Sequence, residues 1–416
     1  MKIKKSIALV MLLLMCLTLF TACNSDNEKD NPNATSTPVP DSSDNENEQE
    51  ELEEGLTGKD YGDGVFLMTE KNVKLLGRTW LDRDFRWLSY SASGVEFKFT
   101  GKSCEFTLRA DSMVNETNHQ ARYAIYVDGE RVVEDVMDIG IKTVPVISAT
   151  ETEEHVIKLV KLSETSDSSM AIQYITCDTD AKIEPTPEKE LKIEFVGDSI
   201  TCGYGVDGVL GDTYSTHNED ATKAYAYRTA EMLDADYSLV SLSGYGIISG
   251  YTTGDKQERQ LVPLYYDKLG NSYGSGGTTT PADVEWDFSF QPDIVVVNLG
   301  TNDNSYTGSD AARKEEYVQG YYSFLETIRE KNPDAIIICA LGVMGQDLCP
   351  QVKEVVNRFT QDKGDSNVYY VKLDAQAYEN GYAVDYHPTS ASHEHAAEQM
   401  SEAITQILAG TYVPAE

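Results

Sequence analysis

Two hydrophobic periods divide the chain. Across residues 56–180 apolar residues recur at every second position, as in Val95, Phe97 and Phe99 and again over residues 123–127. A period of two predicts strands with one buried face, and no segment here carries a helical repeat. We therefore expect an all-β domain of the β-sandwich or jelly-roll kind.

The second half alternates between strand and helix signals. Val318, Tyr321 and Leu325 share one helical face, and the last helix repeats the pattern around Met400. Near-continuous apolar runs occupy residues 192–196, 238–242, 294–299, 335–341 and 368–373. Such runs are typical of a parallel sheet covered on both faces. Residues 192–411 are thus predicted to form a doubly wound α/β domain of the flavodoxin-like kind, joined to the β domain by a short proline-spaced segment over residues 181–191.

The N-terminus has the composition of an export signal. Residues 1–22 begin with three lysines and continue into an apolar run that is too short for a permanent membrane span. Leu19 to Cys23 resembles a bacterial lipobox, which implies diacylglycerol on Cys23. Plain secretion with an incidental cysteine is the alternative. Residues 23–55 carry eleven acidic residues and one lysine, and we expect a disordered linker.

The charge and the cysteine positions argue against nucleic-acid binding and against a metal site. The 416 residues include 34 Lys+Arg and 69 Asp+Glu, a formal net charge of −35. Such an acidic chain is repelled by phosphate backbones, so nucleic acid is not an expected partner. The cysteines beyond Cys23 lie at 104, 177, 202, 339 and 349 with no metal-ligand spacing. We expect buried free thiols, with a Cys104–Cys177 bridge left open, and neither a metal nor an organic cofactor.

Four polar motifs follow strands of the predicted parallel sheet. Gly-Asp-Ser ends at Ser199, Ser-Gly at Gly244, Gly-Thr-Asn at Asn302, and Asp-Tyr-His at His387. The carboxyl ends of such strands line the ligand crevice. Acyl transfer needs a serine nucleophile with a histidine base, and fixed N–H donors for the oxyanion. The backbone N–H groups of Ser199 and Gly244 and the Asn302 amide are candidate donors.

These motifs, in this order, resemble the SGNH (GDSL) hydrolase superfamily. A β-sandwich followed by residues 193–196 and the GDSITCGYG run is more closely similar to carbohydrate esterase family 2, over about residues 64–408. The resemblance implies removal of acetyl groups from plant-wall polysaccharides, with Ser199 as nucleophile, His387 as base, and Gly244 and Asn302 as oxyanion donors. The shorter Gly-Asp-Ser signal alone also fits a simple strand-to-helix turn.

The chain departs from the superfamily at the acidic member of the triad. Many SGNH enzymes place an aspartate three residues before the histidine, where this chain has Val384. Asp385 stands two residues before His387, and in extended backbone these two side chains point to the same side. We therefore expect Asp385 to orient His387. A backbone carbonyl is the alternative.

Three further residue groups have competing interpretations. Trp286 is a candidate for stacking on sugar, although aromatic core packing is the commoner fate. The His393-Glu394-His395 run is predicted to be a plain helix start rather than a ligand pair. Asp303 is expected to be structural and to accept hydrogen bonds from nearby loop N–H groups.

The sequence thus predicts a serine O-acetylesterase acting on acetylated polysaccharide or oligosaccharide, such as xylan or mannan. We expect a monomer that is lipid-anchored at the extracellular face of a bacterial membrane, which it contacts through the anchor alone. An esterase for acetyl or other short acyl groups of cell-wall or host glycans is the first alternative. A non-catalytic carbohydrate- or solute-binding surface lipoprotein is the alternative from another class.

Overall fold

The computed structural model describes residues 61–276 and 279–414. The predictions about the signal peptide, Cys23 and the acidic linker over residues 23–55 therefore fall on residues outside the described part. Among the helices that are described, none has both the length and the apolar character needed to cross a bilayer.

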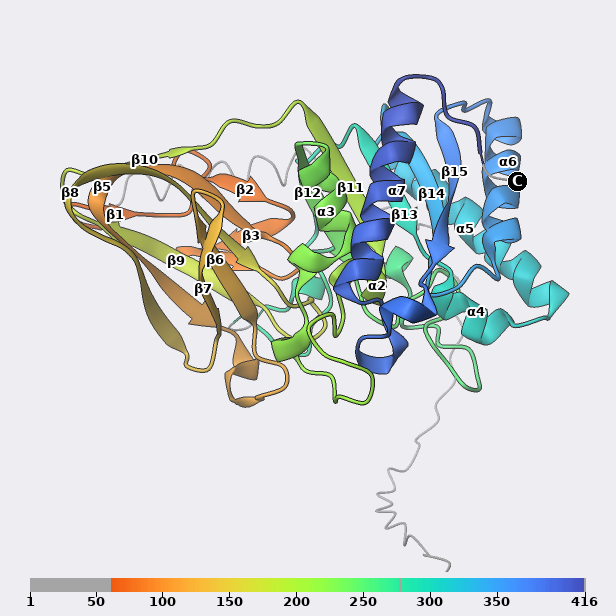
Figure 1. The fold of residues 1–416 in the computed structure, drawn as a ribbon, viewed down its shortest axis with the longest axis horizontal. Coiled ribbons are helices and arrows are strands. Elements are labelled where there is room, and N and C mark those ends of the chain that lie inside the picture. Colours follow the sequence, from red (N-terminus) through yellow and green to blue (C-terminus); the bar gives the residue numbers. More distant parts are fainter. Residues whose placement is uncertain (1–60, 277–278, 415–416) are drawn as a thin grey trace, which may run out of the picture. The chain divides into compact units, whose positions relative to one another are not determined.

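The first half of the described chain is one antiparallel sheet (Figure 1). Its ten strands are β1 (Val65–Phe66), β2 (Lys74–Leu76), β3 (Thr79–Asp82), β4 (Phe85–Leu88), β5 (Gly94–Ala110), β6 (Arg122–Val127), β7 (Glu130–Val136), β8 (Ile141–Lys161), β9 (Met170–Cys177) and β10 (Lys182–Pro185). The main path runs β3-β4-β9-β5-β8-β6-β7, and the short strands β1, β2 and β10 pair beside it. The predicted all-β domain is confirmed.

A bulge in β5 explains how one sheet encloses a core. Before Gly101 this strand pairs with β2 and β10, and after Ser103 it pairs with β9, while β8 follows it along most of its length. A bulge bends the strand and increases its twist, so a single sheet folds over its own apolar face. Val95, Phe97 and Phe99, the residues of the period-two pattern, are all buried in this core.

The second half is a five-stranded parallel sheet with helices on both faces, as predicted. Its strands are β11 (Leu191–Gly197), β12 (Ala235–Ser241), β13 (Ile294–Asn298), β14 (Ile336–Val343) and β15 (Val368–Ala375). Its helices are α2 (Ser199–Cys202), α3 (Tyr225–Met232), α4 (Thr301–Thr307), α5 (Ala311–Lys331), α6 (Cys349–Lys363) and α7 (Ser390–Leu408). Short 3-10 turns occupy Ser112–Asn115, Thr216–Asn218, Ala221–Lys223, Val262–Leu264, Pro281–Asp283, Tyr378–Asn380 and Val384–Tyr386.

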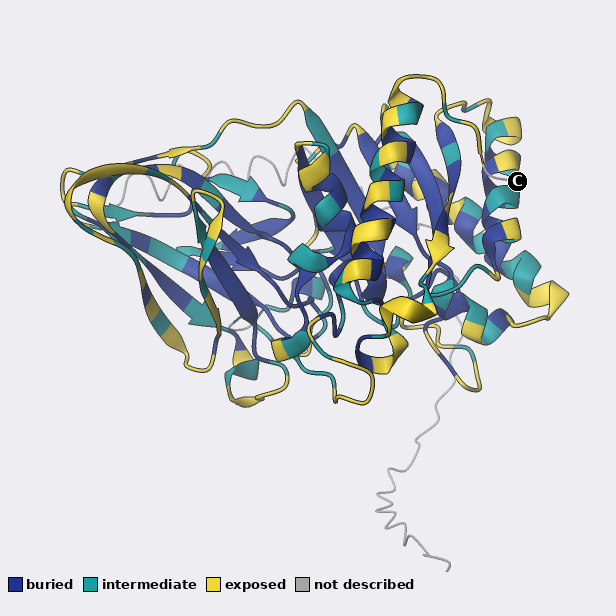
Figure 2. Cartoon of the chain, viewed as in Figure 1, coloured by how far each residue is buried: buried dark blue, intermediate teal, exposed yellow. Residues whose placement is uncertain are grey.

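The order of these strands determines where a ligand can bind. The sheet runs β12-β11-β13-β14-β15, so the chain reverses its direction of winding at β11. Ligands of such sheets bind beyond the carboxyl ends of the strands at this reversal. Helices α3 and α7 pack on one face and α5 and α6 on the other, and Figure 2 shows buried strands beneath helices whose outer faces are exposed.

Buried polar contacts join the β-rich domain to the α/β domain. Arg78, between β2 and β3, forms an ion pair with Glu194 of β11 at 3.0 Å, and both side chains are almost fully buried. Tyr266 donates a hydrogen bond to the same carboxylate at 2.9 Å. The long, weakly periodic segment over residues 247–291 therefore supplies part of the contact between the domains.

The cysteines that the structure describes are all buried free thiols, as expected. Cys104 of β5 and Cys177 of β9 stand at directly paired positions in the sheet. Cys202 is the last residue of α2, the helix that begins at the predicted nucleophile, Ser199.

Candidate active site

Ser199 begins the short helix α2, immediately after β11. The Asp198 carboxylate caps this helix by accepting a hydrogen bond from the Ile200 N–H at 3.0 Å. Because the first turn of a helix has no internal partners for its N–H groups, the Ser199 N–H remains available. Ser199 therefore presents both a hydroxyl and a backbone donor at the carboxyl end of the sheet.

His387 contacts Ser199 although it lies 188 residues later in the sequence, shortly before α7 begins. Its Nε2 lies 2.8 Å from the Ser199 Oγ, and its Nδ1 lies 3.1 Å from the Val384 carbonyl oxygen. A carbonyl can only accept, so Nδ1 carries the proton and Nε2 is free to take the serine proton. Burial lowers the pKa of His387 to about 4, which keeps the ring neutral at pH 7 and able to act as a base.

The structure corrects the role predicted for Asp385. The backbone from Asp385 to His387 is not extended, because Asp385 has φ 50° and ψ 39° and Tyr386 has φ 64°. This left-handed turn directs the Asp385 carboxylate to Tyr204, whose hydroxyl donates to it at 3.1 Å. The alternative, a backbone carbonyl, is the group that contacts Nδ1. Asp385 acts on His387 through its negative charge and its backbone, both of which raise the pKa of the ring.

The side chain of Asn302 connects the two segments that carry the other predicted oxyanion donors, Ser199 and Gly244. Gly244 has φ +80°, and a Cβ added there would meet nothing within 4 Å, so open space lies in front of its backbone. The Asn302 amide donates to the Asp198 carboxylate at 3.2 Å and to the Tyr245 carbonyl at 2.8 Å. These two bonds use both amide hydrogens. Within the described residues, the backbone N–H groups of Ser199 and Gly244 have no hydrogen-bond partner, whereas Asn302 must exchange a partner to join them.

Asp303 has the structural role that was expected. Its buried carboxylate accepts hydrogen bonds from the N–H groups of Ile247, Ile248 and Ser249 at 2.7–3.1 Å. These bonds tie the start of the long segment to α4, next to Asn302.

Trp286 does not reach the site, which corrects the substrate-binding prediction. It is 9% exposed and packs in a cluster with Trp80 and Trp87. Its ring lies 5.3 Å from the guanidinium of Arg78 in the contact between the domains. Two exposed tyrosines that the sequence analysis did not single out lie closer to the catalytic groups. Tyr386, 61% exposed, directly precedes His387, and Tyr251, 60% exposed, donates its N–H to the Gly244 carbonyl.

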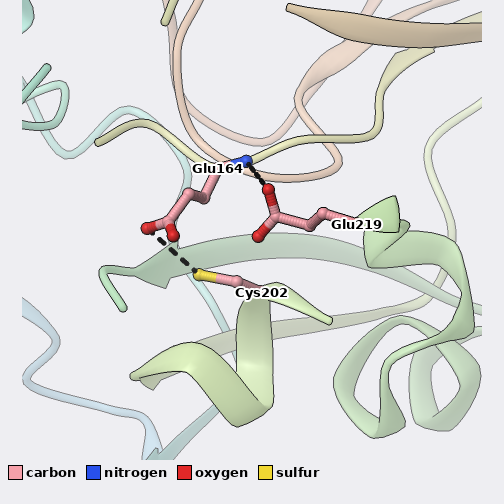
Figure 3. Close-up of side chains that lie close together, drawn as sticks. All are labelled: Glu164, Cys202 and Glu219. Atoms are coloured by element: carbon pink, nitrogen blue, oxygen red, sulfur yellow. Dashed lines mark hydrogen bonds between the residues drawn. The ribbon is translucent and has the colours of Figure 1, made fainter. Parts of the chain in front are cut away.

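Glu164, Cys202 and Glu219 are the three side chains in the described part that offer metal-type ligand atoms close together (Figure 3). These ligand atoms all lie within 4.8 Å of one another, and the residues are buried. The Glu164 Oε2 already accepts the Ser243 N–H at 2.9 Å and the Cys202 thiol at 3.8 Å. The position of the Glu164 carboxylate is therefore explained by hydrogen bonds to protein groups, without a metal ion.

The histidines of the 393–395 run point to different surroundings. His393 is buried in the first turn of α7, where its Nδ1 accepts the Tyr225 N–H. His395 is exposed and contacts Asp374 at 3.2 Å. The two rings do not share a site, which agrees with the predicted helix start.

Comparisons with known proteins agree with this geometry. Residues 193–400 match the GDSL-like lipase/acylhydrolase family, and residues 75–187 match the carbohydrate esterase 2 N-terminal family. The chain is 33% identical to the cellulase/esterase CelE of Acetivibrio thermocellus over 77% of its own length, but spans only 37% of CelE. It is 25% identical to an acetylxylan esterase/glucomannan deacetylase of Cellvibrio japonicus, over 82% of this chain and 90% of that protein.

A solved structure shows the same arrangement of both domains. A family two carbohydrate esterase from Clostridium thermocellum, in complex with cellohexaose, superposes with a TM-score of 0.70 at 30% identity. The match covers 81% of this chain and 99% of that one. With a serine–histidine pair at the reversal point of its sheet and a β-rich domain ahead of it, the chain belongs to the GDSL-like hydrolases and, within them, to the family two carbohydrate esterases.

Proposed function

We propose that the protein hydrolyses O-acetyl esters of carbohydrate through an acyl-enzyme formed on Ser199. The observation that carries the proposal is the 2.8 Å contact between Ser199 Oγ and the Nε2 of a buried, neutral His387. His387 takes the hydroxyl proton as Ser199 attacks the acetyl carbonyl. The N–H groups of Ser199 and Gly244 stabilise the oxyanion, and His387 returns the proton to the departing sugar hydroxyl.

Water then removes the acetyl group from Ser199, with His387 again acting as the base. His387 removes a proton from water, and the hydroxide attacks the acetyl carbonyl on Ser199. As the bond from the acyl carbon to Ser199 Oγ breaks, His387 returns the proton to that oxygen, and acetic acid leaves and ionises to acetate. Because the positive charge that forms on His387 faces a neutral carbonyl at Nδ1, the working unit is a Ser199–His387 dyad. The Asp385 charge nearby contributes at longer range.

The proposed substrates are acetylated hemicelluloses such as xylan or glucomannan. The relatives named above support this choice, and so do exposed aromatic rings at the site. Sugar rings present apolar C–H faces that pack on aromatic side chains. Tyr386 precedes His387 in the chain, the Tyr251 N–H bonds to the Gly244 carbonyl, and both side chains are exposed. Acetylated cell-wall or host glycans remain the second candidate class, because small acetyl esters need the same catalytic groups.

A substrate panel tests the proposal. Purified protein is incubated with acetylated xylan, acetylated glucomannan, O-acetyl peptidoglycan and O-acetyl sialate, and acetate release is measured beside a Ser199→Ala control. Release from the hemicelluloses with no release by the control is expected. Release from the other two glycans alone would change the substrate class, and unchanged release by Ser199→Ala would remove the mechanism.

The proposed location is the outer face of a bacterial membrane, held by lipid on Cys23. Support comes from the lysine-rich start, the apolar run and the small residues before Cys23. Two or more acyl chains are needed for stable anchoring. The acidic linker of residues 23–55 provides a tether of about 30 Å, long enough to hold the catalytic part clear of the bilayer.

A further inference from the structure

The loop that carries the Gly244 donor is held by a residue of the other domain. Glu164 follows β8 of the β-rich domain, and its Oε2 accepts the Ser243 N–H at 2.9 Å. Ser243 immediately precedes Gly244, and Glu164 is 2% exposed. The β-rich domain therefore contacts the peptide next to a proposed oxyanion donor.

The same carboxylate oxygen also reaches the helix of the nucleophile. The Cys202 thiol donates to Glu164 Oε2 at 3.8 Å (Figure 3). Cys202 ends α2, and Ser199 begins it. One oxygen of Glu164 thus joins the two chain segments that supply the unengaged oxyanion donors, the N–H groups of Ser199 and Gly244.

Glu164 is itself held on both sides of its peptide. Its N–H donates to Glu219 Oε2 at 2.8 Å, and its carbonyl accepts the buried Lys161 ammonium at 2.9 Å. Tyr214 donates to the same Glu219 oxygen at 2.9 Å. A group whose own neighbours restrict it in this way can hold another group in place, as outer-shell residues do for catalytic side chains.

Gly244 needs such support because it has no side chain to anchor it. Its φ of +80° is a conformation open to glycine, and the space where a Cβ would stand is empty. Only its neighbours can hold its peptide plane. The Ser243 N–H bonds to Glu164 on one side, and the Tyr251 N–H bonds to the Gly244 carbonyl at 2.8 Å on the other.

We propose that Glu164 is a positioning residue that sets the spacing of the Ser199 and Gly244 N–H groups, so that the β-rich domain is a working part of the catalytic centre. The inference rests on the proposed function. Oxyanion donors must lie 2.7–3.1 Å from the oxygen they stabilise. A shift of the Ser243–Gly244 peptide by a fraction of that distance lowers transition-state stabilisation while leaving the sugar contacts unchanged.

The test compares Glu164→Ala and Glu164→Gln with a matched control, Glu194→Gln. Glu194 is also a buried carboxylate that spans the two domains, through Arg78, but it contacts none of the proposed catalytic groups. A fluorophosphonate that labels Ser199 counts the folded, reactive sites after reaction to completion. Turnover of p-nitrophenyl acetate is then expressed per labelled site, with melting temperature recorded alongside.

The expected result is a split between kcat and KM. Removal of one oxyanion donor costs about 10²–10³ in kcat, so a donor displaced in Glu164→Ala is expected to cost about 10–100-fold with KM nearly unchanged. Glu164→Gln is expected to recover most of the loss, because its amide oxygen can accept the Ser243 N–H. Glu194→Gln is expected to lower the melting temperature while keeping kcat per labelled site.

A kcat per labelled site in Glu164→Ala within about threefold of wild type would overturn the inference, whatever the melting temperature. If Glu164→Ala does not fold, Glu164→Asp replaces it, since the shorter side chain withdraws the acceptor and keeps a carboxyl group. An unchanged kcat in Glu164→Asp would overturn the inference as well. A wild-type protein that reacts with the fluorophosphonate but deacetylates no glycan would contradict the proposed substrate and leave this comparison valid.

Discussion

The Nδ1 of His387 lies 3.1 Å from the carbonyl oxygen of Val384, three residues earlier in the same turn. A backbone carbonyl selects the ring tautomer and the ring orientation as an aspartate does. It carries no full negative charge, so it stabilises the imidazolium less. The site thus combines an orientation that the backbone provides with a base whose pKa burial lowers.

Replacement of either member of the dyad is expected to abolish turnover without unfolding the protein. Ser199→Ala and His387→Ala should each lower kcat by at least about 10⁴-fold, and the double variant should lose little more, because the two groups act as a unit. Acetate release and circular dichroism check this. Near-normal turnover in either single variant would contradict the assignment.

Asp385→Asn is expected to cost about tenfold or less in kcat. A carboxylate that holds the histidine directly costs about 10⁴-fold when it is replaced in this way, whereas here the Val384 carbonyl stays in place. Tyr204→Phe should have a similar small effect, because it removes the 3.1 Å bond to the same carboxylate. Asp385→Asn keeps an amide oxygen that can accept this bond and removes only the charge, so the double variant should combine the two small losses. A loss near 10⁴-fold in Asp385→Asn would restore the triad.

Activity is expected to persist in acid to a lower pH than an ordinary histidine allows. The base must be neutral, and it is lost as pH falls through the pKa of His387, which burial lowers to about 4. The acid limb of kcat/KM on p-nitrophenyl acetate should therefore lie well below the usual histidine pKa of about 6.5. Activity measured after return to pH 7 separates titration from unfolding. An acid limb at or above pH 6.5 would contradict this interpretation.

Tyr386→Ala is expected to weaken binding of polymeric substrate, whereas Trp286→Ala is expected to lower the stability of the fold. Tyr386 is 61% exposed beside His387, so its truncation should raise KM for acetylated xylan or glucomannan and leave KM for p-nitrophenyl acetate nearly unchanged. Trp286 is buried among Trp80 and Trp87, so its truncation should lower the free energy of unfolding by about 3–5 kcal/mol. Urea unfolding and kinetics on both substrates distinguish them. Polymer-specific loss in Trp286→Ala with wild-type stability would reverse the two roles.

Cys23→Ser is expected to release the protein from membranes into the medium when the full chain is expressed in a bacterial host that lipidates exported proteins. The lipobox-like residues before Cys23 are the basis. Fractionation and the mass of the N-terminal peptide check this, with Cys202→Ser as the control for loss of a thiol. Soluble secretion of the unaltered chain, with no lipid mass on Cys23, would refute the anchor.

The pattern of apolar residues by itself determined the two-domain plan. A period of two fits strands with one buried face, and near-continuous apolar runs fit a parallel sheet that is covered on both faces. The carboxyl ends of the strands in such a sheet lie at one edge. That is why Ser199, Gly244, Asn302 and His387 could be placed together from their positions after strands. The chemistry of a serine near a histidine then indicated acyl transfer.

Tertiary structure alone decided the contacts that depend on dihedral angles and on the other domain. Two successive residues with positive φ, Asp385 and Tyr386, turned the carboxylate away from His387, and no spacing rule for extended backbone anticipates such a turn. Trp286 was buried because Arg78, more than 200 residues earlier, lies against its ring. Glu164 contacts the Ser243 N–H, next to Gly244, because the β-rich domain packs against the α/β domain there. Long-range partners are chosen by how the domains pack, and a local pattern along the chain carries no record of that choice.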